Sequence, residues 1–166
     1  NSFVIFILLG ITVILVFFIY YQYKPSKIFR TKDLYSEGLD MMVSGNLHSA
    51  YNCFKDIINF DSNNINAYIK LGQVVREANN SMQALKIHRS LLLRKGLTNY
   101  QKIELYKNLA LDYYKLSKLE ESIQNANLIL DLDKRNEWSL QHLLTIYKKN
   151  DDWEKACNIL IKLHKL

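Results

Sequence analysis

Residues 139–156 read SLQHLLTIYKKNDDWEKA, and this stretch places small and large apolar residues at offsets that recur along the chain. The second of its two adjacent leucines, Leu144, is followed three residues later by Tyr147 and twelve residues later by Ala156. Thirty-four residues upstream, the same three places hold Ala110, Tyr113 and Ser122. Apolar residues three or four apart share one face of a helix, so the stretch predicts packed helices that occur more than once.

The period of thirty-four residues extends over most of the chain once four residues are inserted near residues 97–100. The units then begin near Thr31, Ile65, Ile103 and Glu137 and span residues 31–64, 65–98, 103–136 and 137–166. Each unit has a polar break after about fourteen residues, as two antiparallel helices joined by a turn require. This period is typical of tetratricopeptide repeats (TPR). The sequence therefore predicts an all-α protein in which residues 33–166 form a TPR α-solenoid of four helix pairs.

Two places in each unit need a small side chain, because the two helices approach closely where they cross. The eighth place holds Gly38, Gly72, Ala110 and Leu144, and the twentieth holds Ala50, Ala84, Ser122 and Ala156. Glycine costs about 1 kcal/mol against alanine within a helix, so its use here indicates close packing. Leu144 departs from the rule, and we expect the fourth pair to cross at a wider separation or with its first helix rotated.

The N-terminal segment is apolar and uncharged. Residues 3–21 contain fifteen Leu, Ile, Val or Phe residues. As a helix they are about 28 Å long, close to the ~30 Å hydrocarbon core of a bilayer. A cleaved signal peptide would need a basic start and a small-residue cleavage site, which this segment lacks. We therefore expect a retained transmembrane helix over residues 3–23.

A basic juxtamembrane linker is expected over residues 24–32. Aromatic and basic residues suited to the membrane interface are Tyr20, Tyr21, Tyr23, Lys24, Lys27, Arg30 and Lys32. Because these basic residues follow the apolar segment, the repeats are expected on the cytoplasmic side. They also account for most of the formal net charge of +6, since the chain from residue 33 onward has eighteen basic and sixteen acidic side chains. This distribution does not favour nucleic-acid binding.

Nothing in the sequence indicates catalysis. None of the four histidines has a partner at metal-ligand spacing, and there is no phosphate-binding glycine loop or nucleophile elbow. His88 takes the place of Phe54 in the first unit, so we expect it in the core. Cys53 and Cys157 are expected to be buried, reduced thiols. We predict no catalytic residue, no metal site and no enzymatic activity.

The expected role is binding, because stacked helical repeats create a concave groove. In TPR arrays the first helix of each unit lines this groove. The register assigns to it Arg76, Lys107, Tyr114, Lys115, Gln141, His142 and Lys148. This basic and partly aromatic set suits an acidic or mixed peptide. A merely solvated helix face is an equally acceptable interpretation of the same residues.

With this register, the layout resembles the lipopolysaccharide assembly protein B family of bacterial inner-membrane TPR proteins. The similar segments are LGQVVREANNSMQALKIHRSLL (residues 71–92), LTNYQK in the inserted loop (residues 97–102) and SLQHLLTIYKKNDDWEKA. The Ile87-His88 pair at a usually aromatic place is a further point of similarity. The resemblance covers roughly residues 33–163, whereas the apolar N-terminal segment is similar in character only.

The resemblance implies an adaptor at the bacterial inner (cytoplasmic) membrane, single-pass, with its repeats on the cytoplasmic side. Family members link the membrane AAA protease FtsH to the lipid A deacetylase and so control lipopolysaccharide synthesis. Their membrane helix is implied to contact the bilayer and partner transmembrane helices. A structural TPR scaffold subunit of a membrane or envelope assembly complex remains the alternative.

The family also carries further repeats and a rubredoxin-like zinc module. We therefore expect this chain to be the N-terminal portion of a longer protein. No cofactor is expected in residues 1–166, and zinc is expected only if such a module follows Leu166.

Overall fold

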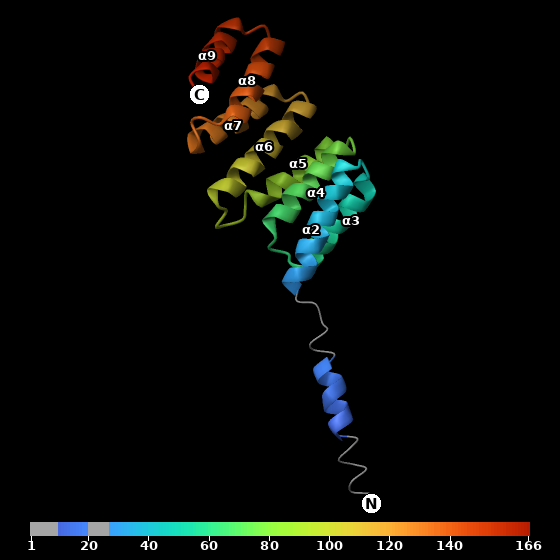
Figure 1. The fold of residues 1–166 in the computed structure, drawn as a ribbon. Helices are drawn as coiled ribbons and strands as arrows, with labels where there is room; N and C mark the ends of the chain where they lie inside the picture. Colours follow the sequence, from blue (N-terminus) through green and yellow to red (C-terminus); the bar gives the residue numbers. More distant parts are fainter. Residues whose placement is uncertain (1–9, 20–26) are drawn as a thin grey trace, which may run out of the picture.

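The computed structural model describes residues 10–19 and 27–166, and every regular element among them is a helix (Figure 1). The helices after residue 26 are α2 (Lys27–Val43), α3 (Leu47–Phe60), α4 (Ile65–Glu77), α5 (Ser81–Leu91), α6 (Asn99–Lys115), α7 (Leu119–Leu132), α8 (Glu137–Lys149) and α9 (Trp153–His164). The all-α class predicted from the sequence is confirmed.

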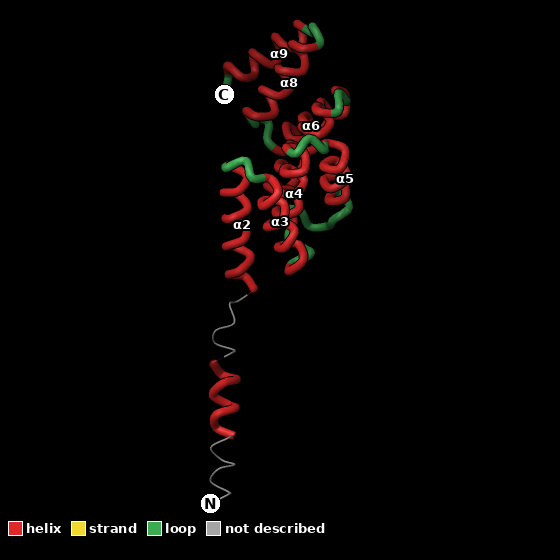
Figure 2. Tube along the Cα trace, turned by 90° about the vertical axis from the view of Figure 1, so that its right-hand side faces the viewer, coloured by secondary structure: helices red, strands yellow, loops and turns green. Residues whose placement is uncertain are grey.

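The helices from α2 onward stack in successive pairs (Figure 2). Within the pairs, α2 contacts α3, α4 contacts α5, α6 contacts α7, and α8 contacts α9. Between pairs, the second helix of one pair packs on the first helix of the next, and α4 also contacts α6. No pair could bury its apolar face alone, so each depends on its neighbours for a core.

The first helix of every pair ends in the same turn. The turn residues Gly45, Asn79, Ser117 and Asp151 all have a positive φ, between 55° and 77°. The residue after each of them donates its backbone N–H to a carbonyl five residues earlier, for example Asn80 N to Val75 O at 3.0 Å. This is a Schellman motif, which satisfies the last carbonyls of a helix. The period of the sequence is thus also a period of the backbone.

The four inserted residues lengthen one helix. Helix α6 begins at Asn99, whereas α4 and α8 begin at the expected starts of their units, Ile65 and Glu137. Thr98 caps α6 through a reciprocal pair of hydrogen bonds with Gln101. Such a capping box fixes a helix start, so the insertion adds about one turn to α6.

The small residues lie where helices touch. A Cβ on Gly38 would lie 2.8 Å from Phe54 Cζ, and a Cβ on Gly72 would lie 2.4 Å from His88 Nε2. Six more of the expected packing positions were Ala50, Ala84, Ala110, Ser122, Leu144 and Ala156. All of these are buried except Leu144, which is partly exposed. His88 is fully buried, as expected for a core residue.

The two cysteines differ. Cys53 is buried in α3, but Cys157 is exposed on α9, so the prediction of two buried thiols is wrong for Cys157. The face of α9 that packs on α8 carries Ala156 and Ile159, and both of these side chains are buried. Cys157 lies beside that face rather than within it.

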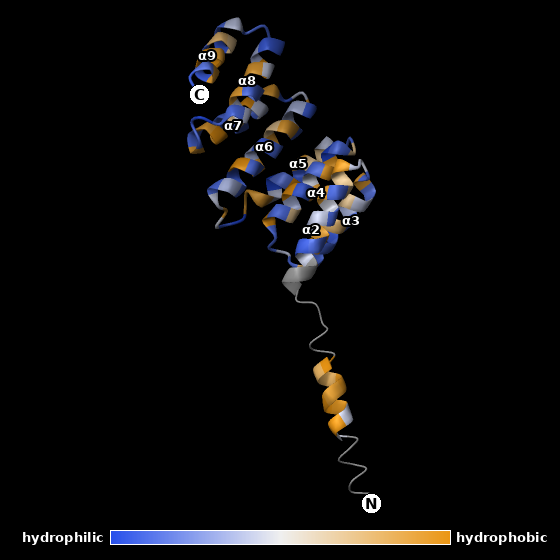
Figure 3. Cartoon of the chain, viewed as in Figure 1, coloured by the Kyte–Doolittle hydropathy of each residue, from blue (hydrophilic) through white to orange (hydrophobic). Residues whose placement is uncertain are grey.

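Only part of the apolar N-terminal segment belongs to the described structure. Residues 10–19 are helical and mostly hydrophobic (Figure 3), and their large apolar side chains are exposed. Residues 3–9 and 20–23 of the expected membrane span, and Tyr20, Tyr21, Tyr23 and Lys24, lie outside the described structure. No helix in the described ranges has both the length and the apolar character needed to cross a bilayer. Of the expected linker, residues 27–32 are helical and belong to α2, and Lys32 is exposed there.

Candidate protein-binding groove

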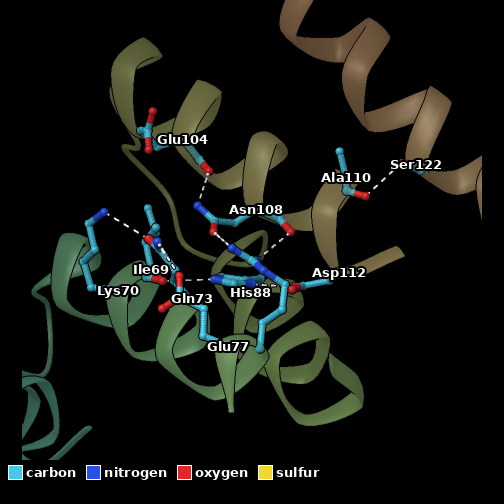
Figure 4. Close-up of polar contacts among 11 residues, drawn as sticks. Ile69, Lys70, Gln73, Glu77, His88, Glu104, Asn108, Ala110, Asp112 and Ser122 are labelled. Carbon is cyan, nitrogen blue, oxygen red and sulfur yellow. Dashed lines mark hydrogen bonds and ion pairs between the residues drawn. The ribbon is translucent and has the colours of Figure 1, made fainter. Parts of the chain in front are cut away.

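A buried charged cluster joins the second and third helix pairs (Figure 4). Arg76 Nη1 on α4 donates to Asp112 Oδ1 on α6 at 2.8 Å, and its Nη2 donates to Asn108 Oδ1 at 2.9 Å. His88 Nδ1 on α5 lies 2.5 Å from Asp112 Oδ2. Arg76 is 8% exposed, and His88 and Asp112 are fully buried. The cluster therefore fills an interface between repeats and is closed to a groove ligand.

Hydrogen bonding fixes the charge of this cluster. The Ile69 carbonyl can only accept, so His88 Nε2, at 3.1 Å from it, must donate. One proton then lies between His88 Nδ1 and Asp112 Oδ2, and the pair is neutral as a whole wherever that proton sits. Adding the Arg76 guanidinium gives the cluster a net charge of +1. No buried side-chain nitrogen or oxygen in the described structure lacks a partner, so the cluster is complete.

The equivalent places of the preceding interface are apolar. Counting back one period from Arg76, His88 and Asp112 gives Met42, Phe54 and Val74, and Phe54 and Val74 belong to one buried core cluster against which Met42 packs. Phe54 lies on Gly38 as His88 lies on Gly72. The same geometry is thus filled by carbon atoms in one interface and by charges in the next.

A second cluster is partly open and joins α6 to α8. Its residues are Lys107, Trp138, His142, Tyr114 and Lys149, and we call it the aromatic–lysine strip. Lys107 Nζ lies 5.3 Å from the centroid of the Trp138 ring, and Lys149 Nζ lies 5.1 Å from that of Tyr114. The His142 ring stacks on Trp138, with centroids 5.0 Å apart and planes 12° apart. It meets the Tyr114 ring edge-on, with centroids 5.5 Å apart.

A hydrogen bond to Ser122 on α7 fixes His142 within the strip. The Ser122 hydroxyl donates to Ala110 O at 2.8 Å, so its oxygen is left to accept from His142 Nε2, also at 2.8 Å. His142 therefore carries its proton on Nε2. Burial lowers the pKa of His142, which favours the neutral ring at neutral pH.

The strip has an excess of positive charge around it. Lys115, Lys148 and Lys149 are exposed, and within the described chain no carboxylate lies in salt-bridge range of them. Glu104 lies 4.0 Å from Lys107, at the limit of an ion pair. Glu137 accepts a hydrogen bond from exposed Gln141. Cations over aromatic rings and unpaired lysines suit an anionic ligand.

The first helices at the other end of the array are more balanced in charge. Lys70 Nζ donates to Gln73, and Gln73 donates to Glu77, so these side chains satisfy one another along α4. A small hollow of about 60 Å³ lies between Tyr35, Tyr100 and Glu104, on α2 and α6. Burial, followed by repulsion from the Tyr100 phenolate when it is ionised and from the Glu104 carboxylate, raises the pKa of Tyr35.

The structure separates the residues that the sequence assigned to the groove. Lys107, Tyr114 and His142 meet in the strip, and Lys115, Gln141 and Lys148 are exposed nearby. Arg76 is not available to a ligand, because Asp112 and Asn108 hold it in the core. Sequence reasoning missed Trp138 and Lys149. The signal for Trp138 was its position four residues before His142, on the same helix face.

Within residues 10–19 and 27–166 there is no group of three or more His, Cys, Asp or Glu residues placed to hold a metal ion. The features with chemical character in this part of the chain are therefore the charged interface and the strip. Of the two, the strip is the one that a partner can reach.

Comparison with known proteins gives relatives that cover most of this chain. No protein-family model matches it. It is similar to lipopolysaccharide assembly protein B of Escherichia coli (strain K12), with 26% identity over 145 residues, covering 87% of this chain and 37% of that protein. It is 29% identical over 140 residues to lipopolysaccharide assembly protein B of Haemophilus influenzae (strain ATCC 51907 / DSM 11121 / KW20 / Rd), covering 80% of this chain and 35% of that protein. The predicted resemblance is confirmed, and the chain spans little more than a third of these relatives' length.

Solved structures show the fold. MamA from Desulfovibrio magneticus RS-1, from residue 41 to its end, has a TM-score of 0.68 at 22% identity, covering 82% of this chain and 75% of that one. A tetratricopeptide repeat protein from Parabacteroides merdae ATCC 43184 has a TM-score of 0.66 at 19% identity, covering 82% of this chain and 53% of that one. At such identities the likeness concerns the fold alone, and it confirms the TPR prediction.

Proposed function

We propose that this chain belongs to a membrane-anchored adaptor that controls lipopolysaccharide synthesis, with its TPR array facing the cytoplasm. It would act as the resemblance implies, by coupling the membrane AAA protease FtsH to the lipid A deacetylase. The observation that carries the proposal is the similarity over 87% of the chain to a protein named for lipopolysaccharide assembly. The fold supports it, because stacked helical repeats bind proteins along their concave face.

The described residues support a binding role rather than a chemical one. The buried charges of Arg76, His88 and Asp112 satisfy one another. The accessible cluster contains Trp and Tyr rings, which are enriched at recognition sites, and lysines that add positive charge beside them. A protein that brings two partners together needs such surfaces and no reactive group of its own.

The proposed anchor is the apolar segment over residues 3–23. Its described part, residues 10–19, is a helix whose large apolar side chains are exposed, with Val16 67% and Ile14 69% accessible. Exposed apolar surface of this extent is unfavourable in water and favourable in a bilayer. The proposal places the basic residues from Lys24 to Lys32 at the cytoplasmic surface.

The test is purification of the tagged protein from membranes of its own bacterium, with the bound proteins identified and the lipid A deacetylase level measured after depletion. Recovery of the protease and the deacetylase, with a changed deacetylase level, is the expected result. Recovery of structural subunits in fixed stoichiometry, with an unchanged deacetylase level, would replace the adaptor by a scaffold. Scrambling residues 3–19 at constant hydrophobicity separates tethering from specific contacts between membrane helices.

A further inference from the structure

The aromatic–lysine strip has the features of a preformed site. Its rings are fixed by stacking and edge contacts among Trp138, His142 and Tyr114. His142 is also fixed by the hydrogen bond that its Nε2 donates to the hydroxyl of Ser122, a fully buried residue. A ligand that lies across these rings therefore orders few side chains, which reduces the entropic cost of binding.

The charges define what would bind. The two cations of the strip, Lys107 and Lys149, lie over rings of α8 and α6 respectively, so each helix contributes a ring to a lysine of the other. A lysine ammonium has three N–H donors. A contact with the face of an aromatic ring does not occupy all three, so donors remain for a carboxylate. Both ammonium groups therefore keep donors for an anion. Lys115 and Lys148 extend the same positive field along α6 and α8.

We propose that the aromatic–lysine strip is the docking site for an acidic, extended segment of a partner protein. Carboxylates of the segment pair with Lys107 and Lys149, and its small apolar side chains and backbone lie over Trp138 and Tyr114. The proposal deepens the adaptor function by assigning one partner contact to one end of the groove. It rests on that function only in requiring that the partner be a protein.

Charge balance favours the strip over the first helices at the opposite end of the array. Along α4, Lys70 donates to Gln73 and Gln73 donates to Glu77, so one lysine and one glutamate are linked there and their charges sum to zero. At the α6–α8 end, three exposed lysines have no carboxylate in range within the described chain. An acidic segment gains attraction only at the second of these places.

The direct experiment measures binding of a short dye-labelled peptide of alternating Glu and Ala to the full chain in non-ionic detergent. The chain has two tryptophans, so Trp153→Phe leaves Trp138 as the only tryptophan, which can be excited selectively over the tyrosines. We expect saturable binding that shifts the Trp138 emission and weakens with added salt. A matched peptide of alternating Gln and Ala should bind at least about tenfold more weakly.

Matched variants locate the site. The double variant Lys107→Gln, Lys149→Gln should bind the Glu peptide with about tenfold lower affinity, because two exposed charge pairs are lost. The control pair is Lys55→Gln with Lys86→Gln, which removes equal charge from exposed sites on α3 and α5. Lys55 also lies over a ring, that of Tyr51, so the control removes a similar local contact. We expect the control to change affinity by less than about twofold.

Several outcomes would overturn the proposal. The proposal fails if both double-lysine variants lose the same affinity for the Glu peptide, or if the Gln peptide binds as tightly as the Glu peptide. It also fails if the Glu peptide shows no saturable binding, or if the strip binds anionic lipid vesicles but not the peptide. The result is independent of the proposed function. If the purification from membranes finds no protease or deacetylase but the strip binds acidic peptides, the adaptor function fails and this inference stands.

Discussion

Replacing the charged interface of Arg76, His88 and Asp112 by apolar residues in one step is expected to leave the free energy of unfolding almost unchanged. Replacing Asp112 or Arg76 alone is expected to lower it. The change is the triple substitution Arg76→Met, His88→Phe and Asp112→Val. It copies the residues found one interface earlier, at Met42, Phe54 and Val74, where an aromatic ring already packs on a glycine. The new side chains therefore have a packing geometry that this fold is known to accept.

The magnitudes follow from the charge of the cluster. Asp112→Val leaves the buried Arg76 guanidinium without a counter-charge, which costs about 3–5 kcal/mol. Arg76→Met leaves the neutral His88–Asp112 pair and removes donors from three acceptors, Asp112 Oδ1, Asn108 Oδ1 and the Asn108 carbonyl, so we expect a loss of about 1–3 kcal/mol. The triple substitution gains about 1–4 kcal/mol by removing buried charges, and loses about 1–3 kcal/mol because Asn108 Oδ1 and the carbonyl oxygens of Ile69 and Asn108 lose their side-chain donors. These nearly cancel, so the triple variant should lie within about 2 kcal/mol of the parent.

The assay is urea unfolding of the full chain, followed by far-ultraviolet circular dichroism and compared at equal m-values. Adding Asn108→Ala to the triple variant is a second arm, and it should recover part of the loss at Oδ1. A triple variant as unstable as Asp112→Val would show that polar contacts, and not charge, govern the interface. An Arg76→Met variant less stable than Asp112→Val would contradict the assigned net charge of +1.

Three further predictions use the same unfolding measurement. Ser117→Gly should raise stability by about 0.5–1 kcal/mol, because Ser117 has a φ of 59° and glycine adopts that conformation freely; a decrease would contradict this. Gly72→Ala should lower stability by about 1–3 kcal/mol despite its better helix propensity, since its Cβ would lie 2.4 Å from His88 Nε2; an increase would mean that the buried ring can move. For His142, burial lowers the pKa in the folded chain, so the unfolded chain binds the proton first and stability falls as the pH drops below the ordinary value of 6.5. His142→Gln should remove this part of the acid sensitivity, and an unchanged pH dependence would rule out its origin in His142.

Features set by local spacing could be predicted from the sequence. The period of thirty-four residues marked the helix pairs, and the position of His88 relative to Phe54 marked it as a core residue before any contact was known. Both depend on which face of a helix a residue occupies, and that is a property of short-range order. The insertion before α6 was located, but its conformation as an added helical turn depends on the capping box at Thr98.

Features that depend on stacking between units could not be predicted in this way. The register alone places Arg76 in the groove, because Arg76 lies on the first helix of its unit. Its partner Asp112 lies thirty-six residues away and reaches it only when α4 and α6 are packed. Likewise the strip needs Trp138 and Lys107 from different units to meet. The sequence signal for this pair was a basic and an acidic residue at interface positions of successive units, and it can be used only once the repeat register is known.

The charged interface also restricts the order in which the units can follow one another. Apolar repeats are interchangeable in principle, since any one buries the face of any other. Here the Arg76 and His88 unit matches only a neighbour that supplies Asp112. A tandem copy of that unit would set its own Val74 against the cation, and loss of the third unit would set Ile146 there. Gene duplication or deletion within this array would therefore leave the Arg76 guanidinium buried without an anion, so the order of the units along the chain is constrained.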